Sequence, residues 1–133
     1  MAGLAAAARL RELGARPVVL EKGTRPGGSM LLSSCVIWHY RDWEQFRAEC
    51  PGGDESLQRV VWERLEDAIE WLVSLGAPVV WDETGNPLTV GKRFDPVGLT
   101  EVLVRKVGDI EVGQTWSDQS DQTDLTSWSG QTG

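Results

Sequence analysis

The sequence of 133 residues predicts a single domain of the α/β class, built around a parallel sheet. Three observations near the N-terminus support this prediction: an alanine-rich amphipathic segment, a glycine directly after it, and then a short apolar run. A helix, a glycine turn and a buried strand in this order form the second half of a βαβ unit. The first strand of such a unit precedes its helix, so we expect this unit to be incomplete at its N-terminal end.

Residues 3–13 are predicted to form the helix, because their apolar side chains recur at helical spacing. These side chains are Leu4, Ala7, Ala8, Leu10 and Leu13. Gly14 stands at the position of a C-terminal helix cap. Residues 17–20 then form a short strand that is apolar throughout, which is typical of a parallel strand buried on both faces.

A second, longer helix gives the clearest pattern in the chain, over residues 57–75, and Gly76 ends it. Its apolar positions are Leu57, Val60, Val61, Leu65, Ala68, Ile69, Leu72 and Leu75. Its acidic positions are Glu63, Glu66, Asp67 and Glu70. We expect these acids to form the solvated face, and Trp62 and Trp71 to pack beside the apolar face.

The remaining elements are shorter. In chain order they are an apolar run at 36–38, a helix at 42–49, a strand at 77–81, a turn in the sequence "DETGNP", a helix that starts at Asp95–Pro96 and stops at Gly108, and a strand that begins at 109–112. Aspartate followed by proline is a strong helix start, because aspartate caps the first turn and proline fits its first position.

The composition argues against several classes of function. A net charge of −7 with no basic stripe predicts that nucleic acid is not a partner. No apolar run approaches the about 18–20 residues of a membrane span, and the N-terminus lacks the layout of a signal peptide. Two cysteines give no disulfide framework, so we expect a cytoplasmic protein.

No metal site is expected. Cys35, His39 and Cys50 are spaced unlike any standard zinc motif, so we expect partly buried cysteines and a surface histidine. Nothing in the sequence near His39 positions it as a general base or as a point of cofactor attachment.

The composition changes abruptly near residue 114. Residues 114–133 consist mostly of Ser, Thr, Gln and Asp and contain no Lys, Arg, Ala, Val or Ile. Such a segment buries too little apolar area to offset its ordering entropy, which predicts a disordered tail. A shifted reading frame explains the same change equally well. The predicted organisation is therefore a domain at 1–113 and a disordered or out-of-frame tail at 114–133.

The predicted strand at 17–20 runs directly into Glu21, which lies eighteen positions after Gly3 and shortly before Gly27–Gly28. A dinucleotide-binding βαβ unit needs a glycine turn at its helix start, where backbone N–H groups and the helix dipole meet a pyrophosphate. It also needs an acid at the end of its second strand to bind the ribose hydroxyls. The spacing therefore predicts a dinucleotide site.

The stretch "GLAAAARLRELGARPVVLEKGTRPGGS" resembles the FAD-binding segment of the fumarate reductase/succinate dehydrogenase flavoprotein family, which includes the ketosteroid dehydrogenases. The resemblance extends over about residues 1–113. It implies a Rossmann-like FAD-binding domain of the glutathione-reductase-like kind that is incomplete at both ends. Gly3 falls on the third glycine of the motif, and Glu21 would hold the ribose. The residues implied on the diphosphate side are Lys22, Gly27, Gly28 and Ser29.

The function implied by this resemblance is FAD-dependent oxidation–reduction of a small carbon substrate by hydride transfer. The proton-transfer groups of the family lie in regions that this sequence does not match, so we assign no catalytic residue and expect no turnover from this chain alone. Two alternatives stay open. An NAD-binding domain shares the helix and the acid but does not account for the "GTRPGGS" loop, and a non-functional gene remnant accounts for the missing motif parts.

Overall fold

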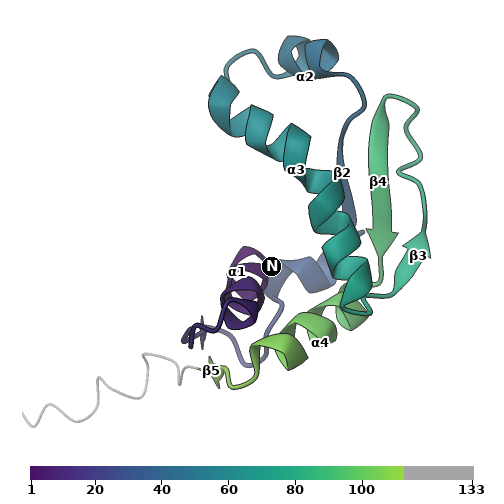
Figure 1. Ribbon diagram of the computed structural model, residues 1–133. Helices are drawn as coiled ribbons and strands as arrows, with labels where there is room; N and C mark the ends of the chain where they lie inside the picture. The colour runs from purple at the N-terminus through teal and green to yellow at the C-terminus, as the bar shows by residue number, and fades with distance from the viewer. Residues whose placement is uncertain (113–133) are drawn as a thin grey trace, which may run out of the picture.

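The computed structural model describes residues 1–112 (Figure 1). In chain order its elements are α1 (Ala2–Glu12), β1 (Leu20–Glu21), the 3₁₀ helix η1 (Gly28–Leu32), β2 (Val36–Tyr40), α2 (Trp43–Glu49), α3 (Glu55–Ser74), β3 (Val79–Trp81), β4 (Thr89–Phe94), α4 (Pro96–Val107) and β5 (Glu111–Val112). The tail predicted at 114–133 lies outside the described residues.

A two-stranded parallel sheet joins β1 to β5, with Leu20 opposite Glu111. Parallel pairing of the first strand was expected, but its predicted burial on both faces is wrong. Val18 and Leu20 are 72% and 75% exposed, and only Val19 between them packs against the core. The strand is also shorter than the predicted 17–20, because only Leu20 and Glu21 pair with β5. One face of this strand is therefore open in the described part of the protein.

A separate antiparallel sheet, in the order β2–β4–β3, was not predicted. The apolar run at 36–38 extends to Tyr40 as β2, and the predicted strand at 77–81 is confirmed in part as β3. The central strand β4 was missed entirely. An α/β fold is confirmed in the broad sense, with the parallel pair and the antiparallel sheet as distinct parts of the protein.

Figure 1 shows α3 along one face of the antiparallel sheet and α1 beside α4 at the other end of the protein. The small side chains of Ala7 and Ala8 allow α1 to pack closely against α4. The core consists chiefly of Leu4, Ala7 and Ala8 of α1, Ile69 and Leu72 of α3, Phe94 of β4, and Leu99, Leu103 and Val107 of α4. Within residues 1–112, no helix has the length and apolar character needed to cross a membrane.

Only the C-terminal half of α3 contributes to this core. Ile69 and Leu72 are 3% and 4% exposed, whereas Leu57 and Val60 near the start of the helix are 67% and 58% exposed. The predicted helix is therefore confirmed, but its apolar face is not buried along its whole length. The first half of α3 extends beyond α1 and α4 toward α2 (Figure 1).

The predicted helix boundaries agree with the structure to within about two residues, and several of them rest on a local capping interaction. Asp95 caps α4 by accepting a hydrogen bond from Gly98 N at 2.6 Å, and Asp42 caps α2 in the same way through Gln45 N at 2.9 Å. Gly14, which follows α1, adopts a φ of +82°, a conformation that glycine reaches without a steric cost.

Glu12 joins three helices at one point. Its carboxylate accepts hydrogen bonds at 3.1 Å from Trp71 Nε1 of α3, pairs with Arg9 at 2.6 Å within α1, and lies 3.2 Å from Lys106 Nζ of α4. The Trp71 bond, followed by the Arg9 bond and then by Lys106, lowers the pKa of Glu12 from 4.5 to about 2. The ionised form of Glu12 therefore stabilises the contact between α1, α3 and α4.

We expect Glu12→Gln to lower the Tm of the chain at pH 7 and to reduce its sensitivity to acid. The folded pKa of about 2 lies below the ordinary 4.5, so the contribution of Glu12 is fully present above pH 4.5 and is lost as the pH falls toward 2. Thermal unfolding followed by circular dichroism between pH 7 and pH 2.5 measures both effects. The control is Glu101→Gln, which removes the same charge from an exposed position on α4. If Tm fell by the same amount between pH 7 and pH 2.5 in Glu12→Gln and in the parent chain, this role of Glu12 would be contradicted.

Candidate functional site

A cleft of about 260 Å³ lies at the N-terminal end of α1, beside the end of β1. Five of the six residues predicted to bind the cofactor line it. They are Gly3, Glu21, Gly27, Gly28 and Ser29. The sixth, Lys22, is exposed and is not among the lining residues. The structure thus brings together residues from three segments of the chain. The two most distant of these residues, Gly3 and Ser29, are 26 positions apart.

The start of α1 offers backbone donors to this cleft. No side chain of the described residues caps the helix at Met1, and the first intrahelical bond runs from Ala5 N to Met1 O at 3.0 Å. The N–H groups of the preceding helical residues therefore have no intrahelical acceptor, and the helix dipole makes this end positive. A Cβ atom added at Gly3 would meet nothing within 4 Å, so a ligand can approach the backbone here.

Glu21 is held at the end of β1 by a local hydrogen bond. Its Oε1 atom accepts from Gly23 N at 2.7 Å, which fixes the carboxylate against the turn that follows the strand. No salt bridge to Glu21 is present among residues 1–112. The half-buried carboxylate therefore keeps acceptor capacity for a donor in the cleft.

The paired glycines shape the opposite wall. Gly27 has a φ of +116°, and a Cβ atom there would lie only 2.8 Å from Leu31 Cγ, so this position requires glycine. Gly28 begins η1 with a φ of +53° and has open space around it. Met30 N donates to Gly27 O at 3.1 Å and fixes the turn. The turn leaves exposed backbone along the cleft at Gly28 and Ser29.

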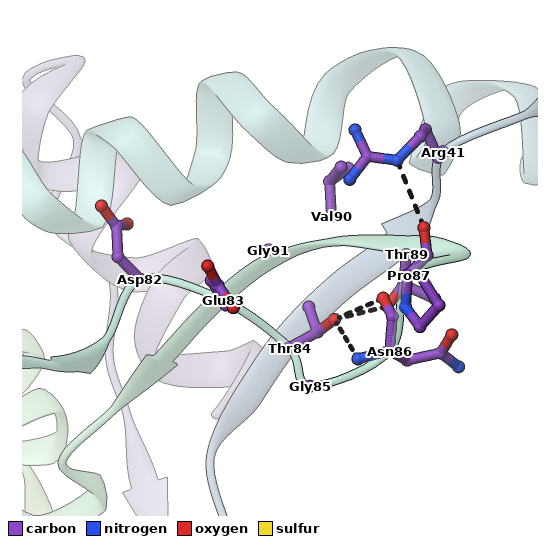
Figure 2. Close-up of a pocket in the computed structure, with 10 residues that line it drawn as sticks. All are labelled: Arg41, Asp82, Glu83, Thr84, Gly85, Asn86, Pro87, Thr89, Val90 and Gly91. Carbon is purple, nitrogen blue, oxygen red and sulfur yellow. Dashed lines mark hydrogen bonds between the residues drawn. The ribbon is translucent and has the colours of Figure 1, made fainter.

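A larger cavity of about 460 Å³ lies inside the β3–β4 hairpin (Figure 2). Its rim is the predicted "DETGNP" turn, and its polar groups bind mainly one another. Thr84 Oγ1 bonds to Asn86 O at 3.1 Å and to Thr89 Oγ1 at 2.6 Å, and Asp82 pairs with Lys92. Because the loop satisfies its own polar groups, we regard the cleft at α1 as the better candidate despite its smaller volume.

The residues considered for metal binding lie apart from this cleft. Cys35 is buried, and burial, followed by the charge of Asp95, raises the pKa of its thiol. The expectation of a surface histidine is wrong, because His39 is only 7% exposed and lies on β2 beneath α3. Among residues 1–112, no three His, Cys, Asp or Glu side chains gather in an arrangement suited to a metal ion.

The two tryptophans of α3 are engaged in structural contacts. Trp62 donates its indole N–H to Tyr40 O at 2.9 Å and packs near Trp43, and Trp71 bonds to Glu12. Both observations agree with the predicted packing role. Sequence reasoning missed these polar contacts, because they depend on which strand and which helix lie beside α3.

Comparison with protein-family models matches residues 1–130 to the family described as FAD binding domain. No curated protein and no solved structure matches the chain. The cleft suits such a cofactor in three respects: its helix start has free backbone donors, a Cβ atom at Gly3 would meet open space, and Glu21 retains an acceptor. Since the family match covers nearly the whole sequence, the chain belongs to the FAD binding domain family, a family of FAD-dependent oxidoreductases.

Proposed function

We propose that the cleft at the start of α1 holds the adenosine diphosphate part of FAD. The observation that supports this most directly is the convergence of Gly3, Glu21 and Gly27–Gly28 on one cleft, since these residues were selected from the sequence alone. Each supplies a group that this half of the cofactor needs: an accessible helix start, a carboxylate and an exposed backbone.

In this proposal the diphosphate lies against the N-terminus of α1. Among the described residues, no arginine or lysine side chain lines the cleft, and the backbone N–H groups and the dipole at the start of α1 supply positive potential there. Lys22 and the exposed backbone of Gly28 and Ser29 flank the diphosphate from the side of β1 and η1.

Glu21 binds the ribose hydroxyls. Its Oε1 atom is already occupied by Gly23 N, which orients the carboxylate toward the cleft that it lines. A ribose diol donates two O–H groups, and an ionised carboxylate is a strong acceptor for them. Gly23 is suited to this arrangement, because an added Cβ atom would lie 3.3 Å from Oε1 and crowd it.

When bound, the flavin supplies hydride transfer to or from a carbon substrate. The described residues bind and orient the cofactor. Within residues 1–112, Glu21 is the only ionisable side chain that lines the cleft, and the proposal assigns it to the ribose, so no other described side chain there is left to exchange protons with a substrate. We therefore propose a cytoplasmic flavoprotein segment, related to the fumarate reductase/succinate dehydrogenase group, that does not turn over substrate on its own.

Glu21→Ala is expected to weaken FAD binding by about 10- to 150-fold, since a hydrogen bond to a charged group contributes about 1.5–3 kcal/mol. Titration of the chain with FAD, followed by isothermal calorimetry and by flavin absorbance, measures the change. Glu83→Ala is the control, because it removes the same charge from the exposed hairpin.

The outcomes separate the alternatives. Unchanged FAD affinity in Glu21→Ala would exclude Glu21 from the site. Tighter binding of NAD than of FAD to the parent chain would favour an NAD-binding domain, and binding of neither would favour a gene remnant.

A further inference from the structure

Besides the cleft at α1 and the cavity in the β3–β4 hairpin, a cavity of about 390 Å³ lies between α3 and the antiparallel sheet. It has no part in the proposed FAD site, and we call it the His39 cavity. It is lined by His39, Arg41, Trp62, Glu63, Glu66 and Val90. His39 and Arg41 are two positions apart, one in β2 and one just after it, so both side chains point to the same face. Val90 lies opposite His39 in the register of β4. Figure 2 shows Arg41 and Val90 on the side of β4 that faces the helix.

The buried imidazole of His39 leaves one nitrogen without a partner. Its Nδ1 atom lies 2.7 Å from Tyr40 O, and since a carbonyl only accepts, Nδ1 carries a hydrogen. The Nε2 atom is buried and has no hydrogen-bond partner in the described part of the chain. The atom facing it is Glu66 Oε1, at 3.4 Å. In the neutral imidazole, two acceptors therefore face each other across this corner of the cavity.

Such a pair of acceptors needs a donor, because a buried polar atom without a hydrogen bond is costly. A primary ammonium group supplies several N–H donors and a positive charge, which suits both Nε2 and the Glu66 carboxylate. Glu66 is 68% exposed on its side chain and is free to adjust to a ligand. Glu63, one turn earlier on α3, lines the same wall, and its carboxylate lies 3.9 Å from Arg59 Nε.

Arg41 supplies the opposite charge. Its Nε atom lies 3.4 Å from Pro87 O, and it forms no salt bridge within residues 1–112. A simple cation would be repelled by Arg41, and a simple anion would be repelled by Glu66. A molecule that carries a positive and a negative group can pair with Glu66 and with Arg41 at the same time. Trp62 and Val90 add apolar surface to the lining of the cavity.

We propose that this cavity binds a small amino carboxylate, a zwitterion with a primary ammonium group, a carboxylate and a compact apolar body. The ammonium group donates to His39 Nε2 and to Glu66, and the carboxylate pairs with the Arg41 guanidinium. The volume of the cavity lies within the usual range for small-molecule sites.

The chain contains a single histidine, so the ¹⁵N resonances of its imidazole report on this site without ambiguity. We would titrate the uniformly ¹⁵N-labelled chain at pH 7.5 with L-leucine, and separately with isobutylamine and with isobutyrate. We expect a saturable shift of the His39 Nε2 resonance with leucine, and a weaker response to either singly charged compound. A proton on Nε2 before any addition, or no response to leucine, would overturn the proposal, because Nε2 would then need no ligand donor or would accept none.

Two variants with equal charge change test the role of Glu66. Glu66→Gln is expected to weaken leucine binding by about tenfold or more, because a charged acceptor is replaced by a neutral one. Asp67→Asn, on the neighbouring exposed position, should bind leucine as the parent chain does. Equal affinity of the two variants for leucine would overturn the proposal that Glu66 belongs to the binding site. The indole N–H resonance of Trp62, which bonds to Tyr40 O, shows in the same spectra that the fold is intact.

Discussion

Phe94→Ala is expected to lower the free energy of unfolding by about 3–5 kcal/mol, the usual cost of truncating a buried phenylalanine. Phe94 is fully buried at the end of β4, immediately before α4 begins. Its ring belongs to the core formed with Leu99 and Leu103 of α4, and its N–H donates to Cys35 O at 3.0 Å. Truncation would leave a cavity where the antiparallel sheet meets the helical core. With a typical domain stability of about 5–15 kcal/mol, this loss is a large fraction of the total.

Urea denaturation followed by tryptophan fluorescence measures the loss, since the chain has seven tryptophans. The control is Leu32→Ala, which removes an apolar side chain that is 89% exposed and should change the stability by about 0.5 kcal/mol or less. A loss below about 1 kcal/mol in Phe94→Ala would contradict the placement of this ring in the core, because so small a cost is typical of exposed positions.

The elements predicted correctly from the sequence are those whose limits depend on local chemistry. Asp95 and Pro96 start α4, and Gly108 ends it with a φ of +83°, as the capping pattern predicted. These signals are readable because a cap satisfies backbone groups within a few residues of itself. No knowledge of the rest of the fold is needed to recognise them.

The strand β4 was missed because its residues do not show a strand pattern. It reads "TVGKRF", with Gly91 and two basic residues in its centre, and glycine and lysine are both depleted in strands. It is a strand because β2 and β3 pair with it on both sides. Long-range pairing of this kind has no local signature, so the antiparallel sheet could not be predicted from the separate segments.

The candidate cofactor cleft was predicted in more detail than the sheets, because its motif combines backbone requirements with one acid. Gly27 is a clear case, since its φ of +116° and its contact with Leu31 explain why glycine stands there. The cavity at His39 was not predicted. Its members were read as the solvated face of a helix and as a surface histidine, and only the packing of α3 on β2 and β4 brings His39 and Glu66 together.

The two sites belong to different parts of the fold. The cleft at Gly3 depends on α1, β1 and η1, whereas the cavity at His39 depends on α3 and the antiparallel sheet. Phe94 and the Asp95 cap of α4 lie where these parts meet. A substitution within the antiparallel sheet should therefore affect the cavity at His39 directly and the cleft only through stability.

Gly91→Ala is the substitution that tests this separation most strongly. Gly91 lies in the middle of β4, opposite Trp38 of β2, with a φ of +155°. A Cβ atom there would lie 2.1 Å from Ile37 O and 2.7 Å from Trp38 Cα, both of which are backbone atoms that no side-chain rotation can move away. We expect a loss of about 2–6 kcal/mol, since overpacking and an unfavourable backbone conformation each cost about 1–3 kcal/mol.

The measurement is urea denaturation together with the ¹⁵N spectrum of the single histidine. The matched control is Gly52→Ala, because an added Cβ atom at Gly52 meets nothing within 4 Å. Gly91→Ala should separate β4 from β2 and shift the His39 resonances, since His39 and Val90 are paired in the register next to Trp38 and Gly91. Because the main contacts of α1 and η1 are with α4, and those of β1 are with β5, FAD affinity should change far less than in Glu21→Ala wherever the chain remains folded. Parent-like stability in Gly91→Ala would show that β2 and β4 are not paired in this register.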